Sequence, residues 1–133
     1  TYTGIAKLQV FINRFPNREY VSEALELMND LQNKLEEKDF EISKQYYTIR
    51  DYTSAIKALD NFIADNPGTI FREEALYFKW LSQFEIAINS VESRIVERVT
   101  ELERSLDNFL RNYPETIFIE DLSEKINIAK KLL

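Results

Sequence analysis

The stretch LDNFIADNPGTIFREEAL at residues 59–76 decides the fold, because two other segments repeat its pattern. These are LQVFINRFPNREYVSEAL at residues 8–25 and LDNFLRNYPETIFIEDLS at residues 106–123. In each copy a proline comes five residues after a phenylalanine, and an aromatic residue comes four residues after the proline. The three sets are Phe11, Pro16 and Tyr20, then Phe62, Pro67 and Phe71, and finally Phe109, Pro114 and Phe118. Such self-similarity is typical of a helical solenoid, whose repeats bury their apolar faces by stacking on one another.

Composition favours helices and narrows the range of functions. The 133 residues include only two Gly and three Pro, too few for an all-β fold with many turns, and they include neither Cys nor His. Disulfides, thiol catalysis, imidazole acid–base catalysis and His/Cys zinc sites are therefore excluded within this sequence. A net charge of −6 argues against nucleic acid, whose phosphates require clustered Lys and Arg. The sequence has no run of about 18 apolar residues, so it predicts no membrane span. We expect no cofactor and no metal.

Proline positions and apolar spacing together predict six helices. Proline disfavours helical geometry in the residue before it, so we expect helices to end at Phe15, Asn66 and Tyr113. A further tight turn is predicted near Ser93–Val96. The predicted helices cover residues 3–15, 20–48, 53–65, 70–93, 97–112 and 117–132, and those at 20–48 and 70–93 are unusually long.

The expected architecture is all-α, a right-handed superhelix of helical hairpins. Residues 1–133 would form one array, with a partial repeat at 1–19, a repeat at 20–68, and a repeat at 69–133 that ends in a capping helix. Helix 70–93 has two apolar stripes and is predicted to be sandwiched between neighbours. One stripe is Phe71, Ala75 and Phe78, and the other is Tyr77, Leu81, Phe84, Ile88 and Val91. The predicted seam of helix 20–48 is Ala24, Met28, Leu31, Leu35, Ile42, Tyr46 and Ile49. The predicted inward face of the last helix is Leu122, Ile126, Ala129 and Leu133.

The central unit YYTIRDYTSAIKALDNFIADNP at residues 46–67 resembles a tetratricopeptide repeat. Ala55 falls on the small residue of that family's second helix and Tyr46 on the aromatic residue of its first helix, while Ser43 keeps a small residue where the two helices approach. Copies spaced 51 and 47 residues apart exceed the repeat length of about 34, which predicts lengthened first helices. The residues that define the repeats are Tyr46, Tyr52, Ala55, Phe62, Pro67, Phe71, Phe109, Pro114 and Phe118.

A longer combination is more specific: FPNREY, a long helix, ISKQYYTIRDYTSAI and then NPGTIFREEAL. It resembles the BamD (YfiO) family, lipoproteins of the machinery that assembles β-barrels in Gram-negative outer membranes. The resemblance implies a helical scaffold at the periplasmic face of the outer membrane. Its partners would be the periplasmic domains of a BamA-like barrel subunit and other assembly lipoproteins. It also implies that this chain is the C-terminal part of a longer protein, with the lipid-bearing cysteine upstream.

Phe40, Lys44 and Tyr47 share one stripe of helix 20–48, at steps of four and three residues. In this class of repeats that face lines the concave groove, so one interpretation is a strip that binds a partner or a peptide. The other interpretation is packing against an adjacent helix, since the long helices of a solenoid have neighbours on more than one side. The loops after Pro67 and Pro114 are the other regions where we expect contacts.

The remaining conspicuous residues favour structural roles. Trp80 is predicted to lie in the core or line a groove, although Trp is also enriched among interface anchors. Acidic pairs such as Glu73-Glu74 and Glu120-Asp121 lie in the predicted first turns of helices, where negative charge is favourable. Adjacent carboxylates on a helix do not converge on one metal ion. We therefore expect solvated faces.

Three alternatives to an assembly scaffold stay open at this point. Another periplasmic repeat protein, such as a Tol–Pal-associated envelope factor, would share the Pro–polar–aromatic phrase but have shorter and more regular repeats. A generic peptide-binding adaptor or co-chaperone would need a cluster of Lys and Asn on its first helices, where this chain offers Lys44. An enzyme is disfavoured because His, Cys and a Gly-rich loop are missing.

Overall fold

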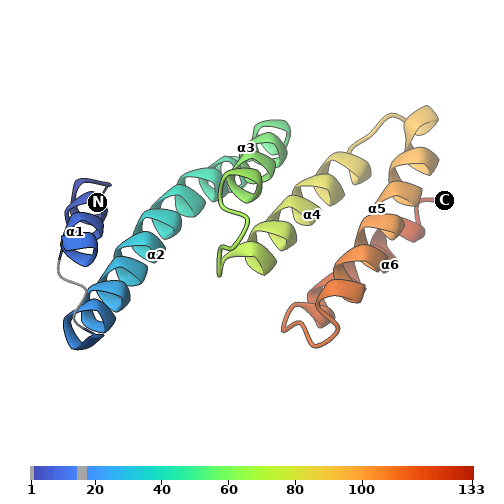
Figure 1. The fold of residues 1–133 in the computed structure, drawn as a ribbon. Coiled ribbons are helices and arrows are strands. Elements are labelled where there is room, and N and C mark those ends of the chain that lie inside the picture. The colour runs from blue at the N-terminus through green and yellow to red at the C-terminus, as the bar shows by residue number, and fades with distance from the viewer. Residues whose placement is uncertain (1, 15–17) are drawn as a thin grey trace.

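The structure is a computed structural model that describes residues 2–14 and 18–133, the side chain of Arg18 excepted. Within these residues it contains six α-helices and no strand, so the predicted all-α class is confirmed (Figure 1). The ends predicted around Phe15, Pro16 and Asn17 lie outside the described residues. The helices are α1 (Tyr2–Arg14), α2 (Arg18–Thr48), α3 (Tyr52–Asp65), α4 (Arg72–Ile88), α5 (Glu92–Asn112) and α6 (Ile119–Lys130).

The helices follow one another as a row of hairpins, each packed on its neighbours in sequence (Figure 1). α2 contacts α1, α3 and α4, while α4 contacts α2, α3, α5 and α6. With 31 residues, α2 is about 46 Å long at 1.5 Å per residue. This arrangement confirms the predicted solenoid of helical hairpins, in which each apolar face is buried by the next hairpin.

Two helices end where proline predicted that they would. Asn66 caps α3 and Tyr113 caps α5, and their backbone N–H groups donate to the carbonyls of Phe62 (3.0 Å) and Phe109 (2.8 Å). The Asn66 side-chain amide also donates to the Phe62 carbonyl, at 3.0 Å. These bonds satisfy carbonyl groups that the end of a helix leaves without partners.

The predicted end of α4 is wrong: the helix stops at Ile88, five residues before residue 93. At this end the side chains of Asn89 and Ser90 donate to the carbonyls of Glu85 (2.8 Å) and Ile86 (2.6 Å), which the end of the helix leaves without backbone partners. Polar side chains that bond to nearby backbone groups compete with continued helix. α4 is therefore an ordinary helix of 17 residues, α5 starts at Glu92, and the turn predicted at Ser93–Val96 lies inside α5.

The turn between α2 and α3 depends on two residues. Arg50 has φ of 65°, the left-handed conformation that commonly ends a helix and that side chains other than glycine adopt at a cost. Asp51 follows, and its carboxylate accepts a hydrogen bond from the Ser54 N–H at 3.2 Å, which caps the start of α3.

Two apolar clusters form the core, and α4 contributes to both, which confirms that it is sandwiched. The first lies among α2, α3 and α4, and its buried residues are Phe40, Leu59, Phe62 and Ala75. The second lies among α4, α5 and α6, and its buried residues are Trp80, Leu81, Phe84, Ala87, Val99, Leu102, Leu106, Phe109, Leu122, Ile126 and Ala129. Val91 and Leu133, predicted to face inward, are 68% and 61% exposed because both lie beyond a helix end.

The predicted seam of α2 holds for its first half and fails for its second. Ala24 is buried, whereas Ile42, Tyr46 and Ile49 are 54%, 38% and 62% exposed. In the second half the inward residues are instead Glu36, Phe40, Ser43 and Tyr47. The seam shifts because α1 covers the first half of α2, while α3 and α4 approach the second half from another side (Figure 1).

Candidate interaction surfaces

The predicted strip of Phe40, Lys44 and Tyr47 lies at the junction of α2, α3 and α4. Phe40 is 1% exposed, and its ring centroid lies 5.7 Å from that of Phe62 and 5.6 Å from that of Phe71, the latter pair stacked. A ring enclosed in this way belongs to the core. At Phe40 the packing interpretation is therefore the one that the geometry fits.

Lys44 and Tyr47 lie at the edge of the same junction and are half-buried. The Lys44 ammonium lies over the rings of Phe40 (5.6 Å) and Phe78 (5.2 Å), within cation–π range, and pairs with Glu41 at 3.5 Å. The Tyr47 ring lies 5.3 Å from that of Phe78, edge-on, and burial followed by the charge of Glu85 raises the pKa of its phenol. Only the solvent-exposed atoms of these two side chains, which we call their exposed rim, are available to contact a partner.

Ser43 and Ala55 occupy the close approaches predicted for small residues. Ala55 is completely buried, and Ser43 is 7% exposed. The Ser43 hydroxyl lies 3.0 Å from the Asp39 carbonyl on its own helix and 3.4 Å from the Ala58 carbonyl on α3. Tyr46, predicted to be the inward aromatic residue, instead lines an open hollow with Ile42, because Ser43 and Tyr47 take the inward positions.

The loops after Pro67 and Pro114 have the same internal structure. The Thr69 hydroxyl accepts from the Phe71 N–H at 3.2 Å, and the Thr116 hydroxyl accepts from the Phe118 N–H at 3.3 Å. Both threonines are buried, so each loop is held in place by an internal hydrogen bond.

An isoleucine follows the threonine in each of these loops and points outward. Ile70 is 69% exposed and Ile117 is 85% exposed. Both loops lie along the same edge of the helix row (Figure 1). Two loops thus present matching exposed aliphatic side chains along one edge of the solenoid.

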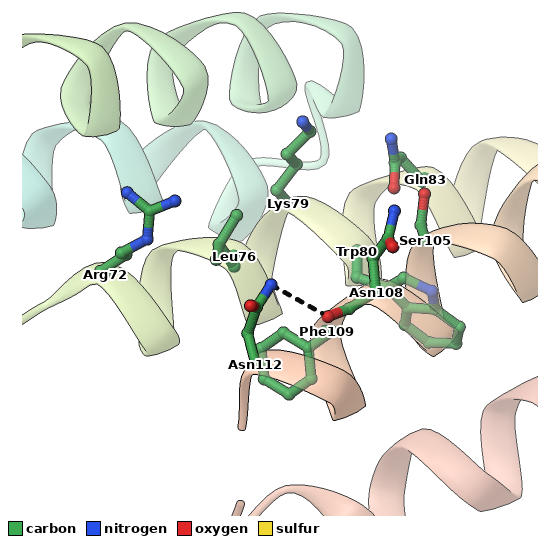
Figure 2. A pocket seen from close by; sticks show the side chains of 9 residues that line it. All are labelled: Arg72, Leu76, Lys79, Trp80, Gln83, Ser105, Asn108, Phe109 and Asn112. Atoms are coloured by element: carbon green, nitrogen blue, oxygen red, sulfur yellow. Dashed lines mark hydrogen bonds between the residues drawn. The ribbon is translucent and has the colours of Figure 1, made fainter. Parts of the chain in front are cut away.

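A polar hollow of about 220 Å³ lies between α4 and α5 (Figure 2). Its floor includes Trp80, which is 2% exposed and whose indole N–H donates to the Leu102 carbonyl at 3.1 Å. The sequence prediction of a core or groove-lining Trp80 is confirmed in both respects. The other lining residues are Arg72, Leu76, Lys79, Gln83, Ser105, Asn108, Phe109 and Asn112.

Sequence reasoning missed this hollow, although a signal was present. Arg72, Leu76, Lys79 and Gln83 form a third stripe along α4 at steps of four, three and four residues. That stripe is mixed in polarity, so it stood out less than the two apolar stripes beside it.

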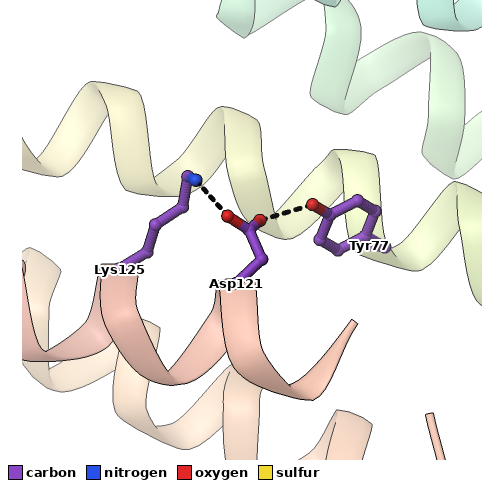
Figure 3. A network of polar contacts seen from close by, with 3 residues as sticks. All are labelled: Tyr77, Asp121 and Lys125. Carbon is purple, nitrogen blue, oxygen red and sulfur yellow. Dashed lines mark hydrogen bonds and ion pairs between the residues drawn. The ribbon is translucent and has the colours of Figure 1, made fainter. Parts of the chain in front are cut away.

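Asp121 fastens α6 to α4 through a short polar network (Figure 3). Its carboxylate accepts from the Tyr77 hydroxyl and from the Lys125 ammonium, and the Tyr77 ring stacks on Phe118 with centroids 3.9 Å apart. Burial raises the pKa of the Tyr77 phenol, and the hydrogen bond to Asp121 adds to this. Burial alone would raise the pKa of Asp121, but the hydrogen bonds from Lys125 and Tyr77 outweigh it and lower that pKa.

The described residues gather no group of three or more His, Cys, Asp or Glu side chains that could hold a metal ion. None of the described helices is both long and apolar enough to cross a membrane. The acidic pairs Glu73-Glu74 and Glu120-Asp121 lie in the first turns of α4 and α6, as predicted.

The row of helical hairpins and the position of α4 in both core clusters define a helical-hairpin solenoid of the tetratricopeptide-like class. The profile of a family described as "YfiO: Outer membrane lipoprotein" matches residues 41–133, more than two thirds of the chain. The chain therefore belongs to the YfiO family of outer membrane lipoproteins, a BamD-like family with a role in outer-membrane assembly and not a known enzyme family. No curated protein matches the chain.

Proposed function

We propose that the chain is a non-enzymatic scaffold of the β-barrel assembly machinery at the periplasmic face of the outer membrane. It binds the periplasmic domains of a BamA-like barrel subunit, with other assembly lipoproteins as further partners. A lipid carried by the longer protein provides the attachment to the membrane. The observation that carries this proposal is the family match over residues 41–133, which span the end of α2 and all of α3 to α6.

The geometry of this region supports a binding role. α4 lies in both apolar clusters and ties the hairpins together. A surface held by a continuous core loses little conformational freedom when a partner docks, which lowers the cost of binding. The family match also favours an assembly scaffold over a Tol–Pal factor or a co-chaperone.

The proposed contact regions are the exposed rim of Lys44 and Tyr47 and the two proline loops. Ile70 and Ile117 are the most prominent side chains of those loops, and their exposure supports a role as aliphatic contacts. Burial of such side chains in an interface is favourable because it removes apolar surface from water.

The test is direct binding of purified periplasmic domains of the barrel subunit to the immobilised chain. We expect saturable binding in the micromolar range or tighter, weakened severalfold by the double substitution Ile70→Ser and Ile117→Ser. Val96→Ser is the matched control, because Val96 is a β-branched residue with 63% exposure on α5, away from both loops.

Two results would count against the proposal in different ways. If the barrel-subunit domains do not bind at all, the assembly role is wrong. If they bind but the double loop variant and the control bind equally well, the role stands and the loops are not the contact region.

A further inference from the structure

A groove runs along α4 because the two helices beside it do not meet. α3 and α5 both pack on α4, yet within the described residues their backbones do not come close to each other. One stripe of α4 lines the space between them, as Figure 2 shows for Arg72, Leu76, Lys79 and Gln83. The stripe is Arg72, Leu76, Lys79, Gln83 and Ile86.

Two hollows mark this groove, and Gln83 lines both of them. The first is the hollow of about 220 Å³ near the start of α4, and the second, of about 140 Å³, lies nearer its end. From Arg72 to Ile86 the groove follows 14 helical steps, or about 21 Å at 1.5 Å per residue.

The two ends of the groove differ in chemistry. The end near the start of α4 has the Arg72 guanidinium together with the side-chain amides of Asn108 and Asn112. At the other end Ile56, Ile86 and Leu102, one from each of the three helices, form a mainly aliphatic surface. Gln83, Arg98 and Glu101 also line this hollow. A ligand that fits both ends must carry an anionic group and an aliphatic group.

The three cations that line the two hollows differ in their side-chain partners. Lys79 pairs with Asp60 at 2.7 Å, and Arg98 donates to the Ser90 hydroxyl at 2.6 Å. The Arg72 side chain, by contrast, is exposed and makes no hydrogen bond or ion pair with residues 2–14 or 18–133.

The side-chain amides suggest what lies between the two ends. Gln83, Asn108 and Asn112 each have donors and an acceptor, which suits the alternating N–H and C=O groups of an extended polypeptide. The Asn112 amide donates to the Asn108 carbonyl at 3.1 Å and keeps its oxygen as an acceptor (Figure 2). Beyond Asn112 a separate hollow is lined by Glu73 and Glu115, so an anionic group is confined to the Arg72 side.

We propose that this groove binds an extended polypeptide segment with an aliphatic side chain at one end and a carboxylate side chain at the other. The aliphatic side chain enters the hollow of Ile56, Ile86 and Leu102, and the carboxylate pairs with Arg72. At about 3.3 Å per extended residue, a length of about 21 Å sets the two side chains roughly six residues apart. The inference rests on the proposed function only in taking polypeptide as the ligand.

The test uses fluorescent peptides with one Leu and one Glu six residues apart in a Ser/Gly background, made in both orders. Fluorescence anisotropy with the purified chain should show saturable binding of at least one of them. A peptide with Gln in place of Glu should bind about tenfold more weakly, because charge-assisted hydrogen bonds are the strong ones. When Leu and Glu are only three residues apart in the peptide, the Glu and Gln peptides should bind equally tightly.

Arg72→Gln identifies the cation. In this variant the Glu and Gln peptides should bind equally, so that the tenfold preference disappears, and Ile56→Ala should weaken both peptides alike. Arg94→Gln is the matched control, because Arg94 is an exposed arginine in the first turn of α5 and should keep the preference. Circular dichroism verifies that each variant is folded.

The proposal is overturned if neither peptide binds at concentrations up to about 1 mM, corresponding to about −4 kcal/mol. It is also overturned if Arg72→Gln keeps the preference for Glu. Binding of the barrel-subunit domains is measured in parallel and decides the proposed function separately. If the peptides do not bind but the barrel-subunit domains do, only the proposal that the groove binds a peptide is refuted.

Discussion

Replacing Phe40 by alanine distinguishes a core residue from a binding residue. Phe40 is the largest fully buried side chain of the described residues, and three aromatic rings surround it at centroid distances of 5.6 to 6.4 Å. Loss of a buried Phe side chain costs about 3–5 kcal/mol in transfer and cavity terms. Alanine is the better helix former and returns about 0.5 kcal/mol. We therefore expect Phe40→Ala to lower the free energy of unfolding by about 3.5 kcal/mol.

The expected shift in melting temperature follows from the size of the chain. An unfolding entropy of about 2.1 cal/mol/K per residue gives roughly 0.28 kcal/mol/K for 133 residues. A loss of about 3.5 kcal/mol then lowers Tm by about 12 °C. Circular dichroism at 222 nm follows all six helices, while fluorescence of Trp80 follows the α4–α6 cluster. If the two signals separate, the hairpins unfold in sequence, as solenoids can.

Ile42→Ala is the matched control, since Ile42 lies two residues further along α2 and is 54% exposed. It should change Tm by no more than a degree or two. If Phe40→Ala leaves Tm within that range while partner binding is lost, Phe40 is a contact residue, and the assignment of the α2–α3–α4 cluster is wrong.

Three smaller changes test other features. Asp121→Asn should lower the free energy of unfolding by about 1 kcal/mol at pH 7, because the neutral amide weakens the hydrogen bonds from Tyr77 and Lys125. The folded pKa of Asp121 lies below its ordinary 3.8, so the difference between the variant and the parent chain should shrink as the pH falls below that value. Urea titrations at pH 7 and pH 3 measure it. Gly68→Ala should stabilise the chain by about 0.5 kcal/mol in the same titrations, because a Cβ there meets nothing within 4 Å and the unfolded chain loses freedom. Arg50→Gly should raise Tm slightly or leave it unchanged, because it relieves a left-handed φ of 65°, whereas Arg50→Ala should give no gain. A marked drop in Tm with Arg50→Gly would mean that the Arg50 side chain, and not its backbone, holds the turn.

Helix ends that depend on local chemistry were predictable from the sequence. α3 and α5 stop at the residue before a proline, because the proline ring restricts that residue regardless of its surroundings. The end of α4 was not predicted, since Asn89 and Ser90 each favour helix termination only moderately, and their bonds to Glu85 and Ile86 had to be seen.

The candidate sites were less predictable than the fold, because exposure is decided by neighbours far away in the sequence. Phe40 and Tyr46 are both aromatic residues of one helix, and only the direction from which α3 and α4 approach made Phe40 internal and Tyr46 external. The groove beside Arg72 depends in the same way on the separation of α3 from α5.

The sequence by itself determined the all-α class, the repeated hairpins and the resemblance to the YfiO family, since apolar period, proline position and repeat motifs are properties of the chain alone. Only the tertiary structure decided which stripe of each helix faces the core and which remains open. The physical reason is that a helix with several apolar and mixed stripes has several ways to pack. The packing adopted is the one in which apolar stripes of several helices meet and leave water together, in the two clusters that share α4.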